Sequence, residues 1–138
     1  MIHTLDFSHL VAYDGDLSGI SLNIKISVVG GSAEFTAKVD MGATDCIFAR
    51  QYGEQIGLDI EAGRLIEIST AIGTFKTFQH WVMLSVLDYE FDVAVCFAAD
   101  EHFSRNVLGR IGFLNQVLLG LNDYEGKLYL SSLAELWQ

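Results

Sequence analysis

Apolar and polar side chains alternate along much of this chain, which is the pattern of strands that bury one face. The alternation is clearest from Ser18 to Val28 and again from Ala33 to Asp40. Between these two runs stand Val29-Gly30-Gly31-Ser32, residues typical of a tight turn. The sequence therefore predicts an antiparallel hairpin whose second strand ends at Asp40.

Five further segments have strand character, and turn or loop residues bound them. In chain order they are Leu65 to Ser69, Lys76 to Leu87, Glu90 to Phe97, Val117 to Asn122 and Lys127 to Leu130. The turn sequence Asp123-Tyr124-Glu125-Gly126 predicts that the last two form a hairpin. The polar stretch from Asp100 to Arg105 is expected to be a loop.

Helical spacing of apolar residues is rare. Arg110 to Gln116 is the best candidate helix, and the spacing also predicts a short helix from Ile47 to Ile56 that ends at Gly57. The segment Leu133 to Gln138 is expected to be a helical turn. The predicted fold is a mostly-β single domain over residues 1–138, a small closed barrel-like sheet with one or two short helices.

Composition places the chain among globular proteins. Of its 138 residues 51% are hydrophobic and 19% are charged, so the chain has enough apolar side chains to form a core. No uninterrupted apolar run reaches the roughly 18 residues of a membrane span. The first residues, Met1 to Asp6, have neither a basic region nor an apolar run, so no signal peptide is expected and the expected location is the cytoplasm.

The formal net charge of −10 narrows the choice of partners. A nucleic-acid-binding face needs clustered Lys and Arg, whereas the eight basic residues here are scattered. Nucleic acid is therefore excluded as an expected partner. Two copies of the chain would repel at long range, so any homodimer has to be held by apolar contact and strand pairing.

Several common site types lack support in the sequence. The histidines follow no metal-binding spacing, no serine stands in a Gly-x-Ser-x-Gly elbow, and no glycine run is followed by Gly-Lys-Ser/Thr. The histidines are His3, His9, His80 and His102. Asp88, Glu90 and Asp92 alternate along a strand, which indicates a solvated face.

The two cysteines, Cys46 and Cys96, have apolar neighbours and no metal-type spacing. They are expected to be buried free thiols rather than a disulfide. Cys46 has no histidine nearby in the sequence to activate it, so packing is the better interpretation of this thiol. Asp40 is left as the residue with a chemical setting, because the end of a rigid strand holds a carboxylate in place and Gly42 permits the turn after it. Asp-x-Gly taken alone is also a common turn sequence, so an ordinary turn without a chemical role is the alternative interpretation.

The segment Asp40-Met41-Gly42-Ala43-Thr44 resembles the active-site loop of retropepsin-like aspartic peptidases, which reads Asp-Thr/Ser-Gly-Ala-Ser/Thr. Two more motifs follow in the order of that family. Thr70 to Phe75 corresponds to the flap, a flexible hairpin with a Gly-rich tip, and Asn106 to Arg110 is similar to the hydrophobic-hydrophobic-Gly-Arg/Asp element. The match is strongest from about residue 22 to residue 130, and the closing hairpin resembles the bacterial and ubiquitin-shuttle members.

The resemblance implies an aspartic endopeptidase that acts on a peptide or protein substrate as a homodimer. Each copy supplies one catalytic Asp40; one carboxylate activates water while the other, protonated, polarises the peptide carbonyl. This mechanism needs no metal or organic cofactor. By resemblance, the substrate-binding residues are Gly42, Ala43, Thr44, Asp45, Ile72 and Gly73, and the supporting residues are Met41, Gly109 and Arg110.

Met41 departs from the family pattern. The resemblance implies that a Thr or Ser at this position would donate a hydrogen bond to the opposite loop of the dimer, and Met cannot donate one. Two functions therefore remain open, an active homodimeric peptidase and a catalytically weak or inactive relative that binds peptides or acts in assembly. An unrelated small β-domain is the third alternative.

Overall fold

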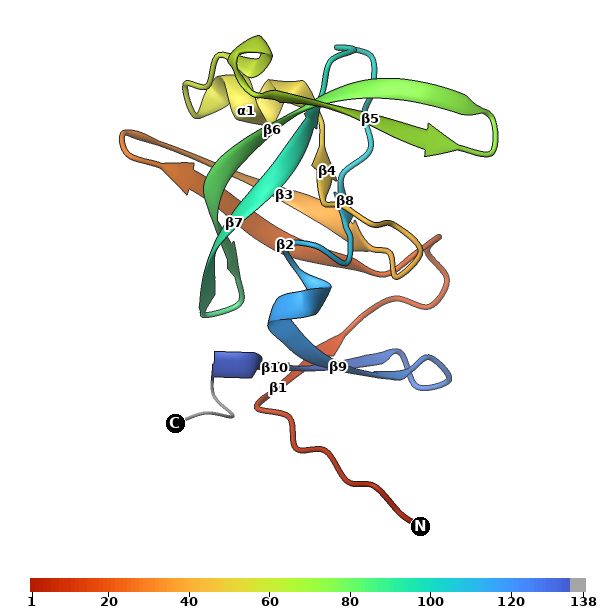
Figure 1. Ribbon diagram of the computed structural model, residues 1–138. Helices are drawn as coiled ribbons and strands as arrows, with labels where there is room; N and C mark the ends of the chain where they lie inside the picture. The colour runs from red at the N-terminus through yellow and green to blue at the C-terminus, as the bar shows by residue number, and fades with distance from the viewer. Residues whose placement is uncertain (135–138) are drawn as a thin grey trace.

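Strands form most of the chain in the computed structural model, which describes residues 1–134 (Figure 1). Their bounds are β1 His9–Ala12, β2 Ser21–Val28, β3 Gly31–Val39, β4 Ile47–Phe48, β5 Arg64–Thr70, β6 Gly73–Val86, β7 Tyr89–Ala98, β8 Val107–Leu108, β9 Val117–Asn122 and β10 Lys127–Ser132. The described helices are α1 (Arg50–Gln55) and two 3₁₀ turns, η1 (Ile60–Ala62) and η2 (Leu114–Gln116). The mostly-β prediction is confirmed.

The larger sheet closes on itself. Its strand order is β2-β3-β8-β4-β7-β6-β5, and β2 also pairs with β6 through the register from Ile24↔Val86 to Ser27↔Met83. This second pairing of β2 joins the two sides of the sheet into a ring. The predicted hairpin of the first strands is confirmed, because β2 and β3 pair antiparallel from Ser21↔Lys38 to Val28↔Gly31. The closed barrel-like architecture expected from the sequence is therefore present.

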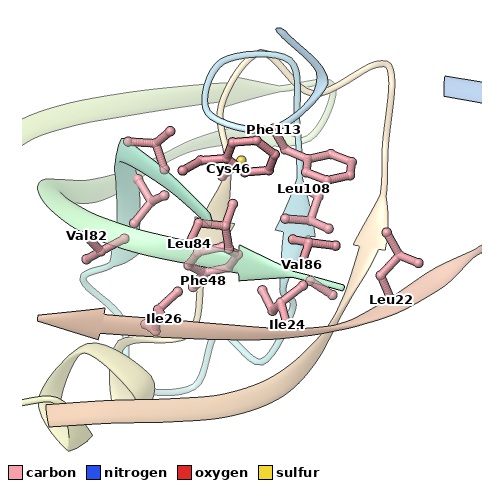
Figure 2. Close-up of a cluster of buried hydrophobic side chains, with 14 of the residues drawn as sticks. Leu22, Ile24, Ile26, Cys46, Phe48, Val82, Leu84, Val86, Leu108 and Phe113 are labelled. Atoms are coloured by element: carbon pink, nitrogen blue, oxygen red, sulfur yellow. The ribbon is translucent and has the colours of Figure 1, made fainter. Parts of the chain in front are cut away.

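The core lies inside this ring (Figure 2). Alternate residues of β2, β3, β6 and β7 point inward, and Ile26, Leu84 and Val95 are completely buried. Phe48 on β4 and Phe113 near η2 fill the interior between strands. Burial of each such side chain stabilises the folded state by about 1.5–3 kcal/mol. The alternation seen in the sequence is thus the alternation between core and solvent.

A second, smaller sheet brings the two ends of the described chain together. Its order is β1-β10-β9, all antiparallel, with His9 opposite Leu130 and Ala12 opposite Lys127. The predicted closing hairpin is confirmed by the β9–β10 pairing. Because β10 is central, β1 and β9 each have an edge that no described strand pairs with. The chain's own strands therefore leave two open edges on this sheet.

The helix predicted from Arg110 to Gln116 is present only as a short 3₁₀ turn at its end. Ile111 instead forms a parallel bridge with Asp45, and Gly112 has a φ of 105°, outside the helical region. Only η2 remains at the end of this segment. The cause is tertiary, since the bridge to the distant Asp45 holds Ile111 in extended backbone ahead of Gly112.

The helix predicted from Ile47 to Ile56 is partly right. Its first two residues form β4, which pairs in parallel with β7, and α1 begins only at Arg50. The prediction for the tail, Leu133 to Gln138, lies mostly outside the described residues. The expected loop from Asp100 to Arg105 is confirmed.

Both cysteines are free and buried, as expected. Burial raises the pKa of Cys46 to about 12 and that of Cys96 to about 11, so both thiols stay protonated near neutral pH. Neither is therefore suited to act as a nucleophile. Asp88, Glu90 and Asp92 are exposed, which confirms the predicted solvated face.

Within residues 1–134 no helix is long and apolar enough to cross a membrane.

Candidate active-site cleft

Asp40 stands at the end of β3, and hydrogen bonds hold the backbone on both sides of this point. The Asp40 N–H donates to the Leu108 carbonyl at 3.0 Å, and the Val39 N–H donates to the Ile20 carbonyl at 2.8 Å. Beyond them, β3 runs parallel to β8, with Val39 opposite Leu108. The Cα of Asp40 is therefore placed by the closed sheet and not by its loop alone.

The turn after Asp40 orients its carboxylate. The Gly42 N–H donates to Asp40 Oδ1 at 2.9 Å, and the Ala43 N–H donates to the Asp40 carbonyl at 3.2 Å. An Asp that accepts the N–H two residues on forms a local turn with its own side chain. Oδ1 is thus engaged within the loop, while the Asp40 side chain is exposed toward solvent.

The rest of this loop is hydrogen-bonded to the segment after β8. The Arg110 N–H donates to the Ala43 carbonyl at 2.9 Å, and the Ile111 N–H donates to the Thr44 carbonyl at 2.8 Å. Asp45 continues the pairing through its bridge with Ile111. Arg110 acts here through its backbone, since its exposed side chain forms no ion pair with any residue in the described part of the chain.

Gly109 lies where these two segments come closest. A β-carbon at position 109 would stand 2.2 Å from the Asp45 carbonyl oxygen and 2.8 Å from the Ala43 carbonyl oxygen. Both distances are shorter than any real contact of this kind, and the atoms belong to backbone that cannot rotate away. Glycine is therefore required for the loop of Asp40 to lie against the 109–111 segment.

The predicted flap is a hairpin made of β5 and the start of β6. The strands pair from Arg64↔Gln79 to Thr70↔Gly73, which leaves Ala71 and Ile72 as the tip. The hydroxyl of Thr70 donates to the Gly73 carbonyl at 2.9 Å and closes the turn. Ile72 is 99% exposed, so its apolar side chain has no partner within the described chain.

These elements enclose a cleft of about 1060 Å³. Its lining includes the predicted catalytic Asp40 and all of the predicted substrate-binding residues, which are Gly42, Ala43, Thr44, Asp45, Ile72 and Gly73. The three predicted supporting residues, Met41, Gly109 and Arg110, do not line it. Residues about thirty positions apart in the sequence thus line one cavity, with the Asp40 carboxylate and the hairpin tip both on its walls.

A solved structure shares this arrangement of strands. The EIAV protease, solved in complex with the inhibitor HBY-793, superposes with a TM-score of 0.56 over 72% of this chain and 88% of the protease, at 16% sequence identity. This chain has a retropepsin-like fold. No protein-family profile and no curated protein sequence match it. At this level of identity the likeness establishes the fold and leaves the activity open.

The cleft also has walls that the sequence did not reveal. The loop residues His102, Phe103, Ser104 and Arg105 line it, and so do Glu67 and Phe75 of the hairpin. Nothing in the local pattern of the 100–105 stretch distinguished it from any polar loop. Its place follows from the end of the β6–β7 ladder at Thr77↔Ala98, which directs the chain past the hairpin.

A second hollow in the described part of the chain is separate from this cleft. A smaller hollow of about 570 Å³ lies against β2, β3 and the β6–β7 turn and shares no lining residue with the cleft. Within residues 1–134 no group of three or more His, Cys, Asp or Glu side chains is placed to hold a metal ion. Among the described residues, the cleft at Asp40 is therefore the candidate functional site.

Gly109→Ala tests how much the loop depends on its contact with the 109–111 segment. We expect the substitution to lower the free energy of unfolding by about 1–3 kcal/mol or more, because the new β-carbon would displace fixed backbone. Urea unfolding measures the change. Gly15→Ala is the matched control, since a β-carbon there would have no atom within 4 Å. Equal stability of the two variants would contradict the close approach at Gly109.

Proposed function

We propose that this chain is an aspartic endopeptidase in which two copies each contribute Asp40 to one catalytic dyad. The observation that supports it best is the placement of Asp40, at the end of a strand held on both sides and in one cleft with the tip of a hairpin. The retropepsin-like fold supports the same interpretation. A peptide in extended conformation is the substrate that a cleft between a strand end and a hairpin suits.

The proposed chemistry needs two carboxylates. Two such groups within hydrogen-bonding distance cannot both ionise cheaply, so they share a proton and titrate as a pair. The ionised member takes a proton from a water molecule between them, and that water attacks the peptide carbonyl. The protonated member polarises the carbonyl oxygen and then helps to protonate the leaving nitrogen. Protein groups and water supply every step.

A second copy would supply the second carboxylate. Several surfaces of the single chain suit that contact, since Asp40 is exposed and Met41 next to it is 61% exposed. The smaller sheet offers the unpaired edges of β1 and β9, with Leu10 and Leu121 largely exposed. Strand pairing and apolar contact at these places would oppose the repulsion between two chains of net charge −10.

A non-catalytic homodimer that binds peptides or serves in assembly is the second candidate, and Met41 is the observation that favours it. A thioether cannot donate the hydrogen bond that would brace the two loops, a loss of about 0.5–1.5 kcal/mol for each bond. Burying two Met side chains in the dimer would return about 1.5–3 kcal/mol each. Met41 therefore permits a stable dimer whose carboxylates are less tightly positioned.

Asp40→Asn tests the catalytic role directly. The amide keeps the shape of the side chain but cannot act as a general base, so peptide hydrolysis should fall by a factor of about 10²–10⁴. The assay is cleavage of a peptide library between pH 4 and 7. Asp92→Asn, an exposed carboxylate on β7 outside the cleft, is the control and should cleave normally. An Asp40→Asn variant that cleaves as fast as the wild type would exclude the dyad.

Assembly through the smaller sheet is tested by sedimentation. The wild-type chain of 15.3 kDa should sediment with about twice that mass at micromolar concentration. Leu121→Asp places a charge on β9 and should shift the protein toward monomer, whereas Leu65→Asp at a similarly exposed position on β5 should not. A wild-type protein that is monomeric while it hydrolyses peptides would contradict both the dimer and the shared dyad.

Met41→Thr separates the two candidate functions. If a missing brace alone limits turnover, the Thr hydroxyl should restore it, and the variant should be at least as active as the wild type with the dimer intact. Without a partner on the opposite loop the buried hydroxyl would cost about 1–3 kcal/mol. Peptide hydrolysis is compared at equal dimer concentration. Lower activity with an intact dimer would show that the loop has repacked around Met.

A further inference from the structure

The outer part of the β5–β6 hairpin extends beyond the sheet. The ladder between β6 and β7 ends at Thr77↔Ala98, so the strand ladder nearer the tip joins β5 and β6 alone. An isolated two-stranded ribbon is marginally stable in water. Every residue from Thr70 to Thr74 is exposed. The direction in which this ribbon extends is therefore set by contacts near its base.

Phe75 is the first side chain of β6 below the tip that is partly buried, and it contacts Phe103 on the opposite wall of the cleft. Its ring stacks on that of Phe103 with the centroids 5.1 Å apart and an angle of 24° between the planes. Both rings line the cleft. Next to this stack, the Ala99 N–H donates to the Lys76 carbonyl at 3.0 Å. The ribbon is thus joined to the loop by one aromatic pair and one backbone hydrogen bond.

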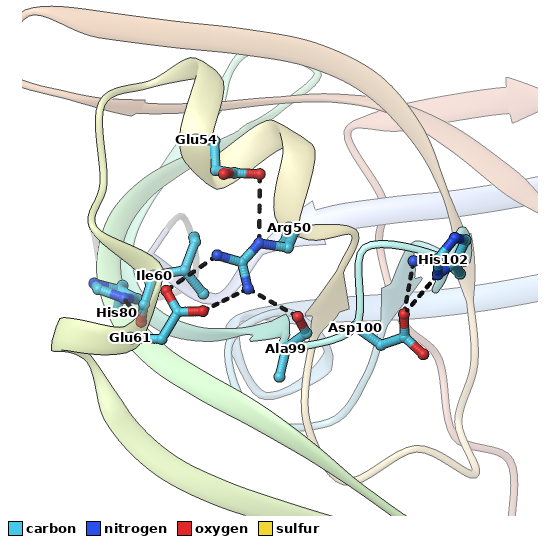
Figure 3. Close-up of polar contacts among 8 residues, drawn as sticks. All are labelled: Arg50, Glu54, Ile60, Glu61, His80, Ala99, Asp100 and His102. Atoms are coloured by element: carbon cyan, nitrogen blue, oxygen red, sulfur yellow. Dashed lines mark hydrogen bonds and ion pairs between the residues drawn. The ribbon is translucent and has the colours of Figure 1, made fainter.

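The loop that carries Phe103 is itself firmly held (Figure 3). Arg50 of α1 donates from Nη1 to the Ala99 carbonyl at 2.8 Å, and the Glu61 carboxylate accepts hydrogen bonds from both terminal nitrogens of the same guanidinium. The hydrogen bond to Glu61 raises the pKa of Arg50, so the guanidinium stays charged. The loop therefore starts from a point fixed to α1 and η1.

A tight turn then sets the position of Phe103. Asp100 Oδ1 accepts the His102 N–H at 2.8 Å, and the Phe103 N–H donates to the Asp100 carbonyl at 3.1 Å. The hydrogen bond from the His102 backbone keeps the pKa of Asp100 below its usual value, so this acceptor remains ionised. Phe103 is thus presented on a preorganised platform, while Phe75 belongs to the ribbon that has to be positioned.

We propose that the Phe75–Phe103 stack is a positioning contact that holds the hairpin of the same chain at the cleft before substrate binds. Phe103 is the fixed half and Phe75 the movable half. The inference rests on the proposed function, since it takes the cleft as the peptide-binding site. When the stack is absent, the ribbon samples other directions, and a peptide has to order it on binding. The contact therefore acts on peptide affinity more than on the chemical step.

The test is hydrogen exchange of residues 68–76 in the free protein, together with steady-state kinetics. Phe103→Ala and Phe75→Ala should each speed exchange in this segment by about two- to tenfold, the range that one aromatic pair supports. KM for a peptide substrate should rise by a similar factor, with kcat changed less. Because both rings touch the same contact, the double variant should exchange no faster than either single variant.

Matched variants distinguish positioning from general damage. Phe103→Tyr retains the stacked ring and should keep exchange of 68–76 at the wild-type rate. Trp81→Ala removes an exposed aromatic from β6 outside the cleft and should also leave this exchange unchanged. Unchanged exchange in both Phe→Ala variants overturns the inference, as does additive behaviour in the double variant. If Phe103→Ala fails to fold, Phe75→Ala on the exposed ribbon decides the matter.

The two proposals fail separately. Exchange in the free protein needs no peptidase activity, so a wild type that cleaves nothing but whose exchange depends on the stack would reject the peptidase and keep the positioning contact. Cleavage that requires Asp40, together with hydrogen exchange that is unchanged when either ring is removed, would support the peptidase and reject the positioning contact.

Discussion

The backbone contact between the Asp40 loop and the segment after β8 is the constraint on which the site depends. Two N–H groups, from Arg110 and Ile111, satisfy the carbonyls of Ala43 and Thr44, and Gly109 permits the approach because it has no side chain. Backbone polar groups in such a loop have to be paired when water is excluded. The same pairing holds the carboxylate at the cleft and turns the chain toward η2.

In the proposed peptidase, a site built in this way would be only half of the catalytic centre. The single chain presents one carboxylate on an exposed loop, and in that proposal its open sheet edges and exposed apolar side chains would be available to a second copy. Met41 would affect dimer stability and catalytic geometry differently, because a thioether favours apolar association but forms no directional hydrogen bond as a donor. In the proposed dimer, burial of apolar side chains would hold the two chains together. The positions of the two Asp40 carboxylates would depend on hydrogen-bond geometry instead.

The hairpin and the loop at residues 99–103 show a related division. The turn of the hairpin can be predicted from adjacent residues, since Gly73 stands next to the exposed Ile72. Residues distant in the sequence set the direction of the hairpin. Its Phe75 ring stacks on Phe103, and Arg50 of α1 holds the loop that carries Phe103. A polar loop without any motif thereby becomes a wall of the cleft.

The sequence by itself determined the long strands of the barrel, the position of Asp40 at a strand end and the glycine turn after it. These features follow from side-chain periodicity and from the φ preferences of single residues, both of which act over a few positions. The tertiary structure alone decided that residues 110–113 are not helical and that Phe103 faces Phe75. In both cases the deciding partners are remote in the chain, and hydrogen bonds or ring contacts with them outweigh the weak local preference for helix or loop.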